Sequence, residues 1–163
     1  MSHYNVIAVT VLAVVALFAS EAAACSCAPP EQPSQAVTDK AVASATAVFL
    51  GYPVVIRLEP VTVTLRERTF DMRTISIVRT QFRVLRSWKG VDSPLVWITA
   101  SEGRGCEYEF EIGRSYVVYA YGHSAALTTN TCSRTRPETD SIFEMERLGP
   151  PHKTFLDSDR IKW

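Results

Sequence analysis

Four cysteines constrain the fold of this 163-residue chain more than any other feature. Two lie one residue apart, at Cys25 and Cys27, and two lie far along the chain, at Cys106 and Cys132. An even number of cysteines is typical of a disulfide framework in an exported chain. A bond between Cys25 and Cys27 would close a strained ring, so both are expected to bond distant partners. Two pairings remain, and each bond would close a loop of about 80 to 105 residues, which contributes about 4 kcal/mol in the chain-entropy model.

The N-terminal segment has the pattern of a secretory signal peptide. Residues 6–18 are apolar except for Thr10, and this run is shorter than the roughly 20 apolar residues that cross a bilayer. Ala22-Ala23-Ala24 follows and precedes Cys25, which is the A-x-A pattern that signal peptidase cuts after. The alternative, a short buried helix of the fold, explains the length but not the cleavage pattern. We therefore predict a secreted protein, extracellular or periplasmic in a bacterium, whose mature chain begins at Cys25.

Removing residues 1–24 as a signal peptide leaves a chain the size of one ordinary domain. We assign residues 25–149 to this domain and residues 150–163 to a C-terminal tail without a strong pattern. The whole chain carries 17 basic and 17 acidic residues. This balance gives no electrostatic attraction to nucleic acid or to an anionic membrane, so neither is expected as a partner.

A structural zinc site is the rival explanation for the cysteines. The Cys25-x-Cys27 spacing differs from the Cys-x2-Cys spacing of most structural zinc sites. The three histidines, His3, His123 and His152, are scattered along the chain and form no ligand pair. Two disulfides are therefore the favoured interpretation.

Turn signals and hydrophobic patterns divide the chain from Ser34 onward into one helix, several strands and a second helix. Ser34 is the expected N-cap of a helix that reaches Ala43. The strands are expected at residues 47–56, 61–65, 78–84, 95–99, 116–121 and 127–131. A second helix is expected after Pro137, and Gly149 ends it. This order predicts a mainly β antiparallel barrel or sandwich, and periodicity does not separate the two.

No motif of a catalytic nucleophile, a metalloprotease or a phosphate-binding loop occurs in the chain, so an enzyme is not expected. Glu107, Glu109 and Glu111 alternate along one segment. A cation site is one explanation for them, and the solvent-exposed face of an edge strand is the favoured one. Arg134 and Arg136 are likewise expected to lie in solvent.

A cysteine at the very start of a mature chain has chemistry of its own. The α-amine of Cys25 would have a pKa of about 8, so a neutral fraction exists at physiological pH. A neutral amine and the carbonyl oxygen of the same residue form a five-membered chelate around a metal ion. A disulfide at Cys25 would hold both groups in place and avoid the entropy lost in ordering a flexible terminus. The alternative is that the disulfide only stabilises the fold.

Several segments resemble the inhibitory domain of the tissue inhibitors of metalloproteinases. The most specific is the run after the expected cleavage site, Cys25-Ser26-Cys27-Ala28-Pro29-Pro30. The others are Val48-Phe49-Leu50-Gly51, residues 82–90 (FRVLRSWKG) and Thr129-Asn130-Thr131-Cys132-Ser133. The likeness covers most of the mature chain, to about Cys132. A third disulfide in this domain and a second cysteine-rich domain, both found in the animal members, have no counterpart in this sequence.

This resemblance implies a fold and a disulfide pairing. The fold would be an OB-like five-stranded antiparallel barrel with flanking helices, of the netrin-like type. In the family, the first cysteine pairs with one in the middle of the domain, and the third residue pairs with a later one. Carried over to this chain, the pairing would be Cys25–Cys106 and Cys27–Cys132.

The resemblance also implies a function, the inhibition of zinc metalloproteinases. The amine and carbonyl of Cys25 would bind the protease's catalytic zinc, and the Ser26 side chain would enter its S1′ pocket. Cys27-Ala28-Pro29 would continue the protease-binding segment, and Gly103-Arg104-Gly105 would pack beside it. The partner would thus be a zinc metalloproteinase, and the inhibitor a monomer without a cofactor of its own.

Two other interpretations stay open. In the first, the chain is a netrin-like module that binds another protein or a glycan, and its N-terminus is only structural. In the second, it is a lipoprotein, because Ala22-Ala23-Ala24-Cys25 is a degenerate lipobox that lacks the usual leucine. Lipidation would consume the Cys25 thiol and block its amine, so it would remove both the Cys25 disulfide and the chelate. Only then would a membrane be a partner.

Overall fold

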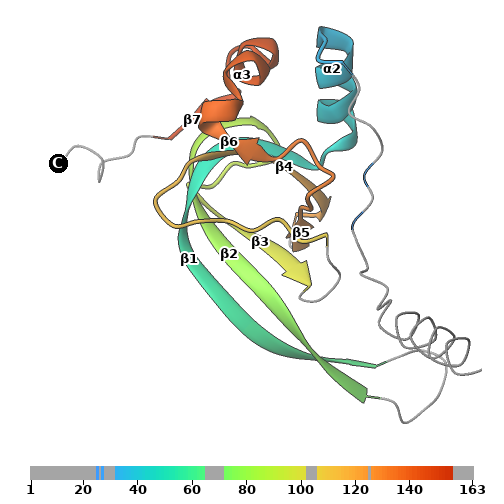
Figure 1. Cartoon of the computed structure of the whole chain (residues 1–163). Coiled ribbons are helices and arrows are strands. Elements are labelled where there is room, and N and C mark those ends of the chain that lie inside the picture. Colours follow the sequence, from blue (N-terminus) through green and yellow to red (C-terminus); the bar gives the residue numbers. More distant parts are fainter. Residues whose placement is uncertain are drawn as a thin grey trace, which may run out of the picture.

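The structure, a computed structural model, describes Cys25, Cys27 and residues 32–64, 72–101, 106–124 and 126–155. The expected signal peptide lies outside these residues. The described part contains two helices, a short 3-10 helix and a seven-stranded sheet (Figure 1). Their bounds are α2 (Gln35–Ser44), β1 (Ala47–Thr64), β2 (Met72–Lys89), β3 (Leu95–Ser101), β4 (Tyr116–His123), β5 (Ala126–Thr128), β6 (Arg136–Pro137), η1 (Glu138–Asp140), α3 (Ile142–Leu148) and β7 (Lys153–Thr154).

Five of the strands close into an OB-like barrel. The order around it is β1-β2-β3-β5-β4, and β4 returns to pair with β1. A closed ring of five strands cannot alternate in direction all the way round, so one seam must be parallel. That seam joins β3 to β5, with Ile98 opposite Leu127, while the other pairs are antiparallel. The OB-like barrel with flanking helices is confirmed and the sandwich alternative is excluded, but the expectation of antiparallel pairing throughout was wrong at the seam between β3 and β5.

β1 and β2 form a long curved hairpin that runs away from the helices (Figure 1). The sequence predicts two strands, 47–56 and 61–65, where the structure has one continuous strand. Gly51 and Pro53 lie at register shifts in the pairing with β2, so they bend the strand without ending it. A Cβ atom at position 51 would lie 2.6 Å from the carbonyl oxygen of Arg83, which explains the glycine there.

The alternating faces of β1 and β4 separate two hydrophobic clusters. Phe49 points into the barrel, where its ring meets that of Phe82 edge-on at 5.5 Å between centroids. Val48 and Leu50 face the other way and pack, together with Tyr119, against residues of α2 and α3. β4 is therefore buried on both faces, which explains the continuous apolar run that the sequence shows there.

Local signals set the ends of the helices. The side chain of Ser34 accepts a hydrogen bond from Val37 N at 3.3 Å and caps α2 as predicted. Lys89 Nζ donates to the carbonyl oxygens of Val42 at 2.8 Å and Ala43 at 3.0 Å, which joins β2 to the end of α2. α3 ends at Gly149, whose φ of 68° lies in the left-handed region.

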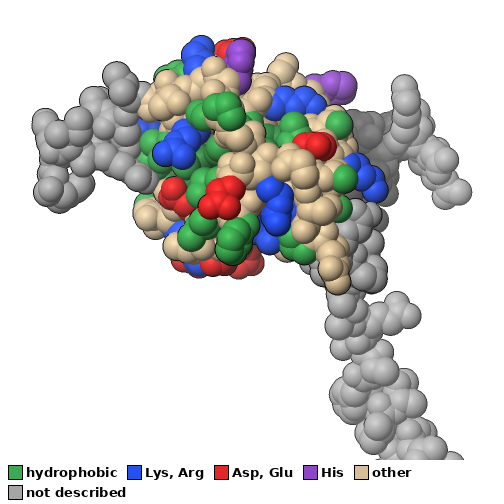
Figure 2. Space-filling model, turned by 90° about the horizontal axis from the view of Figure 1, so that it is seen from above, with side chains coloured by type: hydrophobic (Ala, Val, Ile, Leu, Met, Phe, Trp, Pro, Cys, Tyr) green, Lys and Arg blue, Asp and Glu red, His purple; other side chains and the backbone are tan. Residues whose placement is uncertain are grey.

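The end of the molecule that carries α2 and α3 has a mixed surface. Figure 2 looks onto this end and shows hydrophobic, acidic and basic side chains interspersed. Ile142 and Phe143 of α3 are exposed there. Within the part of the chain that the structure describes, no helix is both long and apolar enough to cross a membrane.

Candidate functional site

Two disulfides attach the N-terminal cysteines to the barrel. Cys25 is bonded to Cys106 and Cys27 to Cys132, which is the pairing that the resemblance implied. In each bridge the two Cα atoms are 5.1 Å apart. Cys25 is half-buried, whereas Cys27 and Cys132 are exposed. Positions 25 and 27 are thus both fixed covalently, and position 26 lies between two fixed residues.

Hydrogen bonds hold the two partner cysteines side by side. Thr131 N–H donates to the carbonyl oxygen of Cys106 at 2.9 Å. Glu107 and Asn130 form an isolated antiparallel bridge next to it. The Asn130 side chain accepts a hydrogen bond from Cys132 N at 2.9 Å. The segment that begins at Cys106 and the loop of residues 129–135, called the Cys132 loop below, are therefore joined by hydrogen bonds. Together they form the platform to which the N-terminal cysteines are bonded.

Buried hydroxyl groups fasten the Cys132 loop to β4. The Thr129 hydroxyl donates to the carbonyl oxygen of Tyr119 at 2.9 Å, and the Thr135 hydroxyl accepts from Tyr119 N at 3.0 Å. The Thr129 and Thr135 hydroxyl oxygens are themselves 2.9 Å apart. Ser133 adds a bond from its hydroxyl to the carbonyl oxygen of Asn130 at 2.7 Å. These hydrogen bonds hold the Cys132 loop against β4 on both sides of the cysteine.

The sulfur atoms form one cluster. Cys25 Sγ lies 3.5 Å from Cys132 Sγ, and the Thr131 hydroxyl donates to Cys25 Sγ at 3.5 Å. The Sγ atoms of Cys25, Cys27 and Cys132 lie within 4.8 Å of one another, a spacing that would suit a metal ion. Both bridges use these sulfurs, however, and zinc binds thiolates. The structure therefore agrees with two disulfides and not with a structural zinc site.

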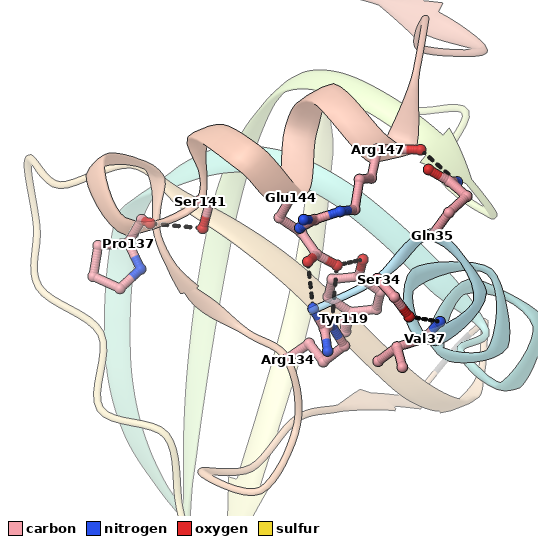
Figure 3. A network of polar contacts seen from close by, with 9 residues as sticks. All are labelled: Ser34, Gln35, Val37, Tyr119, Arg134, Pro137, Ser141, Glu144 and Arg147. Carbon is pink, nitrogen blue, oxygen red and sulfur yellow. Dashed lines mark hydrogen bonds and ion pairs between the residues drawn. The ribbon is translucent and has the colours of Figure 1, made fainter. Parts of the chain in front are cut away.

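A buried ion pair joins the Cys132 loop to α3 (Figure 3). Arg134 Nε donates to the carboxylate of Glu144 at 3.0 Å, and Arg134 Nη2 contacts the second carboxylate oxygen. The Tyr119 hydroxyl donates to the same carboxylate at 2.5 Å. The prediction that Arg134 lies in solvent was wrong, because its partner is on a helix that only folding brings close. Arg136 is exposed, as predicted.

The surroundings of Glu144 favour its charged form. Burial raises the pKa of the Glu144 carboxyl, but the hydrogen bonds from Arg134 and Tyr119 outweigh burial and bring the pKa below its ordinary value. Burial is the main reason why the pKa of Tyr119 is raised, so its hydroxyl keeps the proton that it donates. The hydrogen bond to Glu144 raises the pKa of Arg134. The link between α3 and the Cys132 loop is therefore charged and complete at neutral pH.

The acidic residues Glu107, Glu109 and Glu111 do not lie on an edge strand, so that part of the prediction was wrong, whereas Glu109 and Glu111 are solvent-exposed as predicted. Residues 108–111 have no regular strand pairing. Tyr108 and Phe110 pack against the barrel core instead, with ring centroids 4.8 Å apart. Because these two rings are partly buried against the core, residues 108–111 lie along the barrel without pairing as a strand.

Six of the residues expected to contact a protease lie outside the described residues: Ser26, Ala28, Pro29, Gly103, Arg104 and Gly105. Their roles stay predictions. The described chain ends at Ser101, the last residue of β3, and resumes at Cys106, which is bonded to Cys25. In the sequence, residues 102–105 therefore connect β3 to the cysteine that is bonded to Cys25.

No protein-family model matches this chain, and no curated protein matches it. Its class is therefore defined by its own fold and site: an OB-like barrel to which two disulfides bind the N-terminal cysteines. A small barrel of this kind is compatible with a non-enzymatic role.

Proposed function

We propose that this protein is a secreted inhibitor of zinc metalloproteinases, in which the α-amine and carbonyl oxygen of Cys25 chelate the catalytic zinc of the protease. A catalytic zinc has three protein ligands and keeps a further position for water or substrate. A neutral amine nitrogen and a carbonyl oxygen are suitable donors for that position. The chelate would replace the zinc-bound water, which is the group that attacks the peptide bond.

The double disulfide anchor is the observation that best supports this proposal. Cys25 and Cys27 are each bonded to a platform whose loops are hydrogen-bonded to each other and to β4. Ordering a flexible backbone costs about 1–2 kcal/mol per residue. A terminus that is fixed before the protease arrives avoids this loss on binding, so more of the contact energy appears as affinity.

The proposal requires export and cleavage before Cys25. Two disulfides are common in extracellular proteins and support that compartment. Lipidation would consume the thiol that Cys25 uses in its bond to Cys106. The bond to Cys106 therefore favours a free amine over a lipidated one.

An inhibition titration tests the proposal. The protein that begins at Cys25 is compared with a variant that carries one extra alanine before Cys25, against a panel of zinc metalloproteinases and a fluorogenic peptide. The extra residue turns the amine into an amide and adds atoms where the metal would lie, but it leaves both disulfides in place. We expect inhibition to weaken at least about a hundredfold, or about 2.7 kcal/mol, with an unchanged melting temperature.

Each outcome of this titration separates the candidate functions. If the Cys25 form inhibits no protease of the panel, the inhibitor proposal fails and a netrin-like binding module remains. If both forms inhibit equally, the protein is an inhibitor but the chelate is wrong. The intact mass serves as the control, because a free terminus at Cys25 with two disulfides is four hydrogens lighter than the reduced chain.

A further inference from the structure

A groove beside the platform takes no part in the chelation proposed above. The floor of the groove is the inner face of the sheet, with Ile56 of β1, Val78 of β2 and Ala100 of β3. Its wall is the segment 107–110, and we therefore call it the 107–110 groove. Its volume of about 400 Å³ lies in the range of pockets that hold ligands the size of a few amino acids.

The apolar floor of the 107–110 groove continues beyond it along β1. Ile56 and Leu58 are alternate residues of the strand and share one face. Leu58 lies opposite Val78 in the pairing with β2, which extends the floor by one further cross-strand pair. Ile56 is 41% exposed and Leu58 is 59% exposed. Exposed apolar side chains that continue a groove are typical of a surface that a macromolecular partner covers.

The described residues that line the 107–110 groove carry charge of one sign. Glu107 and Glu109 are the charged ones among them, and none of these described residues is basic. Arg114 is close in sequence, but it pairs with Glu111 at 3.6 Å and lies 6.0 Å from the centre of the Tyr116 ring. The groove therefore combines an apolar floor with an acidic wall, which is complementary to an apolar side chain flanked by basic ones.

We propose that the 107–110 groove binds an extended segment of a protein partner that carries a leucine-like side chain next to lysine or arginine. The apolar side chain lies on Ile56 and Val78, and the cation lies against Glu109. Glu107 directly follows Cys106, so a partner seated here also lies close to the disulfide-bound Cys25. The inference does not require that Cys25 binds zinc.

A nuclear magnetic resonance titration of the whole disulfide-bonded protein tests the inference. The probe is acetyl-Arg-Leu-Arg-amide, and the controls are the peptides Glu-Leu-Glu and Arg-Ser-Arg with the same end groups. We expect shifts of amide signals at Ile56, Val78, Ala100 and Tyr108 with the first peptide only. Absent shifts, shifts spread over the whole surface or equal binding of Glu-Leu-Glu would overturn the inference.

Two matched variants locate the basic contact. Glu109→Lys reverses a charge that lines the groove, and Glu146→Lys reverses an exposed charge on α3, outside it. We expect Glu109→Lys to weaken binding of the peptide at least about threefold, and Glu146→Lys to leave it unchanged. Equal effects of the two variants would contradict the assignment. Concentration-dependent shifts in the groove without peptide would mean that a second copy of this chain occupies it, which would also overturn the inference.

Discussion

Replacing Glu144 by glutamine removes the charge that joins α3 to the Cys132 loop. The residue is 5% exposed, and its carboxylate accepts hydrogen bonds from Tyr119 and Arg134. Glutamine has nearly the same shape, and its carbonyl oxygen can still accept the Tyr119 hydroxyl. Its amide nitrogen, however, is a donor that would face the guanidinium of Arg134. The variant therefore leaves a mostly buried cation without its counter-charge.

The size of this effect follows from the burial of the pair. A hydrogen bond to a charged group contributes about 1.5–3 kcal/mol, and breaking a fully buried ion pair costs about 3–5 kcal/mol. The Arg134 side chain is 20% exposed, so water screens part of its charge. We expect the free energy of unfolding to fall by about 2–3 kcal/mol at neutral pH. Glu146→Gln, an exposed position on the same helix, is the control and should change it by less than about 0.5 kcal/mol.

The stabilisation that the Glu144 carboxylate contributes should depend on pH. Because the pKa of Glu144 is lowered in the folded protein, its stabilising effect is complete above the ordinary carboxyl pKa. The stabilisation is lost as the pH falls through the pKa that Glu144 has in the folded protein. A protonated Glu144 resembles glutamine, so the difference in unfolding free energy between wild type and E144Q should shrink below about pH 4. Urea denaturation at neutral and acidic pH measures this difference.

Two results would exclude a stabilising role for the Glu144 charge. If Glu144→Gln and Glu146→Gln destabilise the protein equally, the buried pair does not stabilise the fold. If the difference between wild type and E144Q stays the same at neutral and acidic pH, the carboxylate charge is not its cause.

Four further substitutions have defined outcomes. Gly90→Ala should cost about 2 kcal/mol or more of unfolding free energy, because φ is +67° and the new Cβ would lie 2.1 Å from the Thr46 carbonyl oxygen. Gly113→Ala should cost less, since a Cβ there meets nothing within 4 Å. Lys89→Met should cost about 1 kcal/mol in the same urea assay, because α2 loses two bonds at its last turn. Ser26→Arg should weaken inhibition without lowering the melting temperature, and unchanged inhibition would mean that this side chain does not enter the S1′ pocket.

Features that depend on neighbouring residues could be predicted from the sequence. Ser34 begins α2 and Gly149 ends α3, because a cap and a left-handed turn act within a few residues of themselves. The continuous apolar run of β4 correctly predicted a central strand, since both of its faces are buried. The cysteine spacing excluded the bond between Cys25 and Cys27, while the pairing itself came from the resemblance.

Features that depend on the closed barrel could not be predicted. Residues 57–60 are expected to separate two strands, but they pair with residues 76–79 of β2, so β1 continues through them. The pair of Arg134 and Glu144 spans a loop, a short strand and a 3-10 turn, so periodicity gives no signal for it. The 107–110 groove depends on residues from three strands and a separate segment, and it exists only after the barrel closes.

Cobalt spectroscopy detects whether Cys25 coordinates the catalytic metal of a metalloproteinase. The catalytic zinc of a metalloproteinase is replaced by cobalt(II), whose visible absorption changes with its ligands. We expect the protein beginning at Cys25 to change this spectrum up to one equivalent, and the form with an extra alanine to leave it unchanged. Inhibition of the cobalt enzyme with an unchanged spectrum would rule out coordination by Cys25, because the contact would then lie away from the metal.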